Sequence, residues 1–221
     1  MAAPGDSLSD ISIKDGESIL FIGDSITDCG RRAQEAPLGN GYVRIFSELV
    51  TAMFPDKHIR YVNKGIGGNR ITDLRDRWQH DVMSQDFDWL SMMIGMNDAA
   101  SYIRGSPDSV SPQLFAEIYD RLLETTVDKH PCNVVLLDPF FISRDTTGNS
   151  IRSRFLELLP QYIEVVHSMS EKYSTRLVKT HEIFQKHLEY REHDYFAPEP
   201  VHPYHIGHVI IACALLKELS L

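Results

Sequence analysis

The chain has 221 residues, of which 43% are hydrophobic and 24% are charged. This length and composition predict one globular domain with a sizeable core, and they exclude a disordered tail or a fibre. Asp and Glu number 31 against 22 Lys and Arg, which gives a formal net charge of −9. Such a balance argues against nucleic acid or anionic lipid as a partner, so a small-molecule substrate is expected instead.

The cysteine content indicates the compartment. Cys29, Cys132 and Cys213 lie far apart and form no CxxC pair, so neither a disulfide framework nor a thiolate zinc site is expected. A reducing compartment, the cytoplasm, is the predicted location. The first ten residues lack the basic and apolar regions of a secretion signal, and no stretch of about 18 apolar residues occurs. We therefore expect no membrane association.

Five short apolar runs, each flanked by polar turns, are predicted to be strands. They are residues 18–23, 59–63, 88–95, 133–139 and 175–179. Segments with helical spacing lie between them or follow them, at 41–53, 72–83, 112–127, 155–172 and 203–219. Ser111 and Pro112 form a helix cap and first-turn pair, and Pro203 is expected in the first turn of the last helix. Strictly alternating strands and helices predict a parallel sheet covered by helices on both faces, with ligands beyond the carboxyl ends of the strands.

No internal repeat or Pro/Ser-rich linker divides the chain. Residues 1–15 are expected to be an N-terminal extension, and residues 16–221 a single domain. A Gly-Asp-Ser-Leu tetrad at residues 5–8 lies within that extension. Because no apolar strand precedes it, Ser7 would lack the rigid mount that a nucleophile needs, and we interpret this tetrad as a decoy.

Ser25 follows the first predicted strand, within the sequence Gly-Asp-Ser-Ile-Thr-Asp. A serine that leaves a buried strand and enters a helix or turn can present its hydroxyl at the edge of the sheet, where helix amides favour negative charge. Serines in such positions also commonly cap helices. The motif alone therefore leaves a nucleophile and a cap equally open. Asp24 and Asp28, which flank the serine, are interpreted as hydrogen-bonding supports of the turn.

Three glycines, Gly65, Gly67 and Gly68, follow the second predicted strand. Glycines let the backbone approach a ligand closely and point an amide at it. A dinucleotide site is not expected, because Arg70 replaces the third glycine of that fingerprint and no acidic ribose partner is obvious. No GK[ST] phosphate loop occurs either. A simple tight turn remains the alternative interpretation.

Asn97 follows the third predicted strand, in the sequence Gly-Met-Asn-Asp. Its side-chain NH₂ group is suited to stabilise a developing oxyanion at the same edge of the sheet as Ser25. Asparagine is also an ordinary turn residue, and that reading stays open.

His202 is the candidate general base near the C-terminus. Glu199 stands three residues earlier, so that its carboxylate can fold over to the Nδ1–H of the ring. A lone histidine is more often a packing or surface residue. The positions of His202, His205 and His208 spread around a helix with no further ligands nearby, so no metal site is expected.

These four motifs, in this order, resemble the four blocks of the SGNH hydrolase superfamily, also called GDSL esterases. The resemblance spans residues 19–214, and four ordered blocks are far more specific than any one of them. It implies a three-layer α/β/α fold like that of flavodoxin, with a five-stranded parallel sheet and no cofactor. It also implies that Ser25 is the nucleophile, that His202 is the general base, and that the oxyanion hole comprises the amides of Ser25 and Gly68 and the side chain of Asn97.

The acid of the triad departs from the family pattern. The family usually carries Asp three residues before the histidine, and this chain has Glu199. Glutamate is chemically competent in such triads, but the loop must absorb its extra methylene. Asp194 is the rival acid, and the spacing favours Glu199.

The segments LFIGDSITDCGRR and VNKGIGGNRITDLRDRW are similar to those of intracellular acetylesterases that act on xylan fragments. The resemblance implies a serine esterase for O-acetyl groups on xylo-oligosaccharides, and relatives of this type are often homo-oligomers. Alternatives within the superfamily are a lysophospholipase, a thioesterase or an arylesterase, and a degenerate carbohydrate-binding protein is the non-enzymatic alternative. Trp78 and Tyr204 are candidates for stacking on sugar rings, whereas Trp89 and Tyr42 are more readily explained as core residues.

Overall fold

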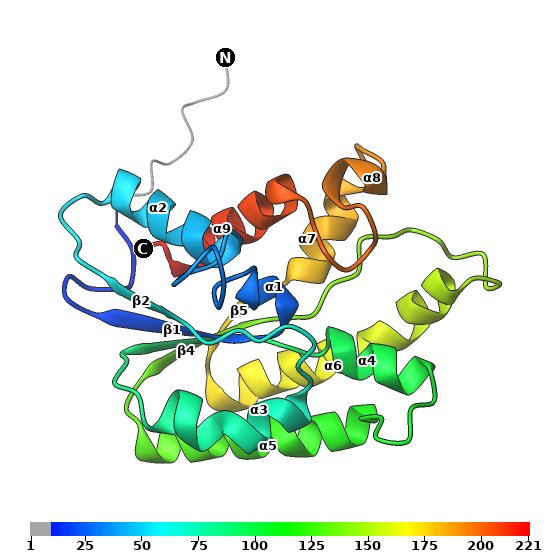
Figure 1. Cartoon of the computed structure of the whole chain (residues 1–221), viewed down its shortest axis with the longest axis horizontal. Coiled ribbons are helices and arrows are strands. Elements are labelled where there is room, and N and C mark those ends of the chain that lie inside the picture. Colours follow the sequence, from blue (N-terminus) through cyan, green and yellow to red (C-terminus); the bar gives the residue numbers. More distant parts are fainter. Residues whose placement is uncertain (1–9) are drawn as a thin grey trace.

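Five parallel strands form the central sheet, in the order β2-β1-β3-β4-β5 (Figure 1). The structure is a computed structural model that describes residues 10–221. The strands are β1 (Ser18–Gly23), β2 (Arg60–Asn63), β3 (Trp89–Met93), β4 (Asn133–Leu137) and β5 (Arg176–Val178). The predicted five-stranded parallel sheet is therefore confirmed, and each predicted run contains one of these strands.

Helices cover both faces of the sheet, which gives the three layers expected from the sequence (Figure 1). One layer contains α1 (Ser25–Asp28), α2 (Tyr42–Met53), α7 (Thr180–His187), α8 (His193–Phe196) and α9 (His205–Leu219). The other contains α3 (Ile71–Trp78), the π-helical turn η1 (Gln79–Met83), α4 (Met96–Ile103), α5 (Pro112–Lys129) and α6 (Ile151–Tyr173).

The strand β1 shows why the apolar runs are nearly continuous. Its side chains alternate between the two faces, so Ile19 and Phe21 join one core cluster while Leu20 and Ile22 join the other. All six of its residues are buried. A strand covered by helices on both faces needs apolar side chains at odd and even positions alike, as parallel sheets generally do.

Two helix boundaries differ from the predictions. The helix expected over residues 72–83 ends at Trp78 and continues as the π-helical turn, and α9 begins at His205 instead of Pro203. The backbone of Tyr204 is extended, and its N–H donates to the carbonyl of Phe196 at 2.7 Å, so the helix begins only after it. The cap predicted at Ser111 is confirmed, since its hydroxyl accepts from the N–H of Leu114.

Three helices were not predicted from the sequence. The buried face of α4 includes Asp98 and Ser101, which hide its apolar periodicity. Helix α7 buries only Thr180 and Phe184, and α8 has four residues. Short helices with so few buried apolar positions give no recognisable 3.6-residue pattern.

The start of the described chain packs against its end. Ile11 forms an antiparallel bridge with Ser220, and both Ile11 and Ile13 are buried in the same cluster as α2 and α9. A domain boundary at residue 15 stays a prediction, and the tetrad with Ser7 lies outside the described residues. Within residues 10–221, no helix combines the length and the apolar character that a membrane span requires.

Candidate active site

The hydroxyl of Ser25 stands where β1 ends and α1 begins. The carboxylate of Asp24 caps this short helix by accepting the N–H of Ile26 at 3.0 Å, which agrees with its interpretation as a support of the turn. Gly23 is required immediately before it, because a Cβ there would lie 2.3 Å from the carbonyl oxygen of Met93 on the neighbouring strand. The local sequence thus fixes Ser25 on a rigid strand-to-helix turn.

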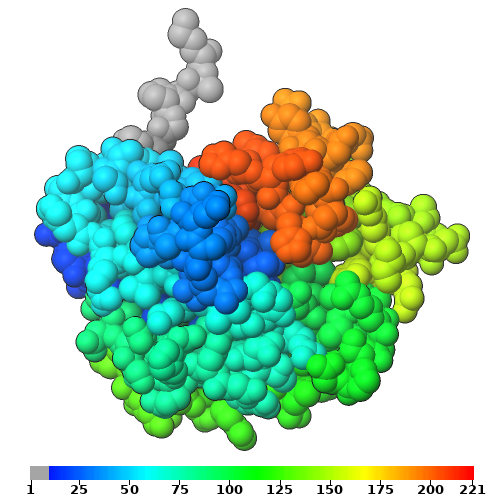
Figure 2. Space-filling view, in the orientation of Figure 1, coloured from blue at the N-terminus to red at the C-terminus, as the bar shows by residue number. Residues whose placement is uncertain are grey.

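Ser25, His202 and Glu199 form a continuous chain of hydrogen bonds. Ser25 Oγ lies 2.9 Å from His202 Nε2, and His202 Nδ1 lies 2.5 Å from Glu199 Oε1. The blue segment that contains α1 and the orange segment that leads into α9 accordingly lie side by side on one face of the molecule (Figure 2). Residues that are 177 positions apart in the sequence are thereby brought into contact.

The carboxylate of Glu199 curls over its own loop. Its Oε1 also accepts the N–H of His202 at 2.8 Å, and its Oε2 accepts the N–H of Val201 at 2.9 Å. Partial burial disfavours the charged form, but the hydrogen bonds from Val201 and His202 outweigh it and lower the pKa of Glu199. An ionised Glu199 can only accept at Nδ1–H, which leaves the lone pair of Nε2 directed at Ser25 Oγ. Asp194, the rival acid, is exposed on α8.

The glycine turn after β2 lies against the serine. A Cβ on Gly67 would be 3.9 Å from the Cβ of Ser25, and one on Gly65 would be 2.3 Å from the amide nitrogen of Asp28. Asp28 accepts the N–H of Gly67 at 2.9 Å and also pairs with Arg32 at 2.9 Å. The close approach of the two backbones therefore depends on the absence of a side chain at Gly65, whereas a Cβ at Gly67 would make only ordinary van der Waals contacts.

Two amide groups of this region each have an N–H that donates no hydrogen bond within residues 10–221. Gly68 has a φ of +81°, and its N–H donates to no other atom within the described part of the chain. The side-chain amide of Asn97 donates one N–H to the carbonyl of Asn69 at 3.1 Å, which leaves its second N–H available. The hydrogen bond from Asn97 to Asn69 thus joins the segment after β3 to the turn after β2, one residue from Gly68.

One residue that holds this arrangement was not predicted from the sequence. Arg77 of α3 donates to the carbonyls of Lys64 at 2.8 Å and Gly23 at 3.2 Å, and to the side chain of Asn69 at 2.8 Å. It also pairs with Asp81 one turn along, at 2.8 Å. The spacing of Arg77 and Asp81 is the only signal in the sequence, and it is equally typical of an exposed surface pair.

The aromatic candidates divide by exposure. Trp78 is only 4% exposed and donates its indole N–H to Thr126, so the prediction that it stacks on sugar is wrong. The interpretation of Trp89 and Tyr42 as core residues is confirmed by their burial. Tyr204 is 49% exposed and lies two residues after His202, where a ligand can reach it.

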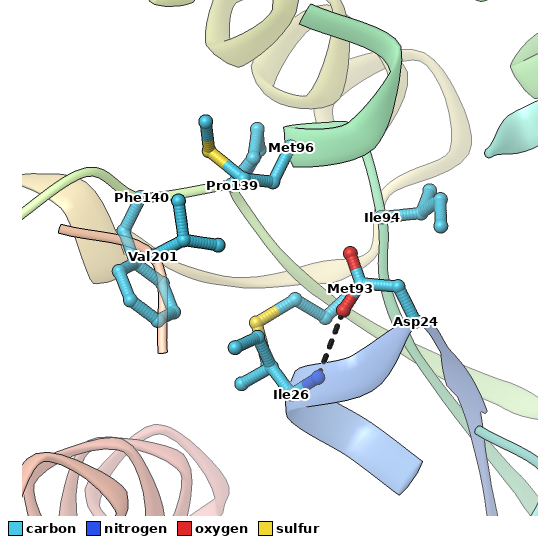
Figure 3. A pocket seen from close by; sticks show the side chains of 8 residues that line it. All are labelled: Asp24, Ile26, Met93, Ile94, Met96, Pro139, Phe140 and Val201. Carbon is cyan, nitrogen blue, oxygen red and sulfur yellow. Dashed lines mark hydrogen bonds between the residues drawn. The ribbon is translucent and has the colours of Figure 1, made fainter. Parts of the chain in front are cut away.

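Two buried aspartates flank the donors. Asp98 accepts the N–H of Ile71 at 2.9 Å, and its second oxygen has no partner. Burial raises the pKa of Asp24 to about 6 and that of Asp98 to about 7. Asp24 also lines a small cavity between the strand ends, together with Met93, Met96 and Val201 (Figure 3).

The third histidine of the C-terminal run has other partners. His208 Nδ1 accepts the N–H of Tyr42 at 3.3 Å, and its Nε2 lies 3.5 Å from Cys29 Sγ. Burial lowers the pKa of His208 to about 4 and raises that of Cys29 to about 12. Among residues 10–221, no group of three or more His, Cys, Asp or Glu side chains is arranged to hold a metal ion.

Comparison with known proteins relates this geometry to characterised enzymes. The profile of the GDSL-like Lipase/Acylhydrolase family matches residues 21–210. An acetylxylan esterase of Geobacillus stearothermophilus is 36% identical over 218 residues, which cover 95% of this chain and 97% of the relative. A crystal structure of that acetylxylan esterase, Axe2, has a TM-score of 0.85 at 35% identity and covers 95% of this chain and 96% of its own.

Further solved structures agree with this similarity. Three are catalytic mutants of Axe2, in which a serine, an aspartate or a histidine is replaced by alanine, and the aspartate stands three residues before the histidine. LAE5, an α/β hydrolase from the metagenome of Lake Arreo, has a TM-score of 0.86 at 29% identity and covers 95% of this chain and 98% of its own.

Proposed function

Because the chain belongs to the GDSL-like lipase/acylhydrolase family, we propose that it removes O-acetyl groups from xylo-oligosaccharides by way of an acyl-enzyme on Ser25. The observation that carries the proposal is the hydrogen-bonded chain from Ser25 Oγ through His202 to Glu199. The name of the Geobacillus relative supports acetylated xylan fragments as the substrate class.

In the first step His202 acts as general base. Its Nε2 takes the proton of Ser25 Oγ while that oxygen attacks the acetyl carbonyl carbon. The carbonyl π electrons move onto oxygen, and the amides of Ser25 and Gly68 and the side chain of Asn97 stabilise the resulting oxyanion. When the tetrahedral intermediate collapses, the sugar oxygen leaves and receives the proton from His202.

In the second step water repeats the sequence. His202 removes a proton from water, the hydroxide oxygen attacks the acetyl-serine, and Ser25 leaves with the proton that His202 returns. Glu199 is proposed to hold the ring in the tautomer with Nδ1–H directed at its carboxylate. It also stabilises the imidazolium that forms in both steps.

The test compares the wild type with Ser25→Ala on acetylated xylo-oligosaccharides and on p-nitrophenyl esters. We expect acetate release by the wild type, a preference for acetyl over octanoyl esters, and loss of nearly all turnover in Ser25→Ala with the fold unchanged. A serine-directed phosphonate should label the wild type and not this variant.

Each other outcome points to a different function. A preference for octanoyl esters would indicate a lysophospholipase or thioesterase, and the absence of both turnover and labelling would indicate a carbohydrate-binding protein. The cytoplasmic location and a homo-oligomeric state stay predictions from the cysteine content and the family resemblance.

A further inference from the structure

Asn69 is joined to two of the amides proposed for the oxyanion hole. Its backbone carbonyl accepts the side-chain N–H of Asn97 at 3.1 Å. It directly follows Gly68, whose N–H has no acceptor within residues 10–221. The position of Asn69 therefore determines where both donors point, since one is bonded to it and the other is its neighbour in the chain.

The hydrogen bond to Asn69 sets the direction of the second N–H of Asn97. The NH₂ group of a side-chain amide is planar, so when one N–H is directed at a fixed carbonyl, the other points in a defined direction. An oxyanion donor has to lie about 2.7–3.1 Å from the developing charge. A displacement of about 1 Å can already lower the rate by two orders of magnitude. The carbonyl of Asn69 must therefore be held in place.

The turn that carries Asn69 has little stiffness of its own. It contains Gly65, Gly67 and Gly68, and glycine is the residue with the greatest backbone freedom. Gly67 and Gly68 are exposed, so packing in the core does not immobilise them. On the α1 side, the carboxylate of Asp28 accepts the N–H of Gly67 at 2.9 Å. A second attachment on the other side of the turn is needed to fix Asn69.

Arg77 provides this attachment from α3, which lies in the helical layer opposite α1 (Figure 1). Its Nε donates to Oδ1 of Asn69 at 2.8 Å, and its Nη1 and Nη2 donate to the carbonyls of Lys64 at 2.8 Å and Gly23 at 3.2 Å. Gly23 ends β1 and Lys64 follows β2, so one guanidinium spans both strand ends and the turn. Asp81 also accepts from Nη1, at 2.8 Å, and fixes the side chain of Arg77, which is only 15% exposed.

We propose that Arg77 is a positioning residue for the oxyanion hole: through the side chain of Asn69 it fixes the carbonyl that directs Asn97 and the adjacent N–H of Gly68. The inference rests on the proposed acyl-enzyme mechanism, in which Gly68 and Asn97 stabilise the oxyanion. A planar guanidinium, with donors in fixed directions, suits this task better than the single ammonium group of a lysine.

The experiment is a double-mutant cycle between Asn69 and Asn97, with kcat and KM measured on p-nitrophenyl acetate. Asn69→Ala removes the acceptor of Arg77 and keeps the backbone carbonyl that accepts from Asn97. We expect this variant to lower kcat about tenfold with KM nearly unchanged, and Asn97→Ala alone to lower kcat by about 10²-fold or more. In the background of Asn97→Ala, Asn69→Ala should lower kcat only about threefold, because one of the two donors that it misdirects is gone.

This non-additivity separates positioning from general damage to the fold. A variant that merely loosened the fold would lower kcat by the same factor in both backgrounds, and that result would overturn the proposal, as would a wild-type kcat in Asn69→Ala. Arg77→Met removes the same hydrogen bond from its other end and should lower kcat at least as far, since the contacts with both strand ends are lost as well. If Asn69→Ala does not fold, Arg77→Met in the same cycle provides the test.

Arg75→Met is the matched control, because Arg75 lies on the same helix and undergoes the same substitution. Its guanidinium pairs with Asp76 at 2.9 Å, and its side chain is 49% exposed. This variant should keep the wild-type kcat. A loss as large as that of Arg77→Met would overturn the specific role of Arg77.

The two proposals fail in different ways. Turnover that survives Ser25→Ala would contradict the acyl-enzyme mechanism itself. A loss of about 10²-fold in Asn97→Ala together with a wild-type kcat in Asn69→Ala would leave that mechanism intact and reject only the positioning role.

Discussion

The side chain of Glu199 shows how one extra methylene is accommodated at the residue scale. Both of its oxygens accept backbone N–H groups within its own loop, from Val201 and His202, before Oε1 also reaches the ring. The longer side chain therefore folds back along the chain. Its position is determined by three hydrogen bonds over a span of three residues.

Replacing this acid separates its charge from its length. We expect Glu199→Gln to lower kcat by about 10²-fold or more, because an amide NH₂ group facing Nδ1 favours the wrong tautomer of His202. Glu199→Asp keeps the charge and should retain more activity than the glutamine variant. Steady-state kinetics on acetylated xylo-oligosaccharides measure both effects. Equal activity in Glu199→Gln and the wild type would mean that another acid is the third member of the triad. Asp194 would then be the first residue to replace in a further variant.

At the scale of elements, the sequence predicts strands better than short helices. The run at residues 18–23 is apolar at every position but its ends, and β1 has these same bounds. Helix α4 could not be found in this way, because its buried face includes the polar side chain of Asp98. That side chain is accommodated by a tertiary hydrogen bond with Ile71, which the sequence does not reveal. The roles of Ser25 and His202 were suggested by their motifs, whereas the contacts of Arg77 exist only once α3 lies beside the strand ends.

Two glycines of the turn after β2 should respond differently to alanine. In Gly65→Ala the new Cβ would lie 2.3 Å from the backbone of Asp28, so α1 must shift and kcat should fall at least tenfold. In Gly68→Ala nothing lies within 4 Å of the new Cβ, and the cost is the positive φ of 81°, about 1–2 kcal/mol of stability. Urea unfolding and kcat together test the contrast. Equal losses of activity in the two variants would contradict it.

At the scale of the whole molecule, the pH dependence of stability reflects the buried carboxyls. Burial raises the pKa of Asp98 from 3.8 to about 7, so the folded protein favours its neutral form. Such a group contributes its full stability below about pH 4, and that contribution is lost as the pH rises towards 7.

Asp98→Asn removes this titration while keeping an oxygen that can accept from Ile71. The free energy of unfolding of Asp98→Asn, measured relative to that of the wild type, should therefore be greater at pH 8 than at pH 5 by on the order of 2 kcal/mol. Urea unfolding at the two pH values measures the difference. A difference that does not change with pH would mean that Asp98 is ionised in the folded protein across this range.

Because the contact between Ser25 and His202 joins distant parts of the chain, activity also depends on how much of the chain has been made. The serine turn leaves the ribosome before its base, which arrives only with the segment that leads into α9, 177 residues later. Until α9 docks against α2, a nascent or C-terminally shortened chain holds a serine with no base to activate it. Hydrolysis of the ester should therefore begin only when the serine turn and the segment before α9 have come together.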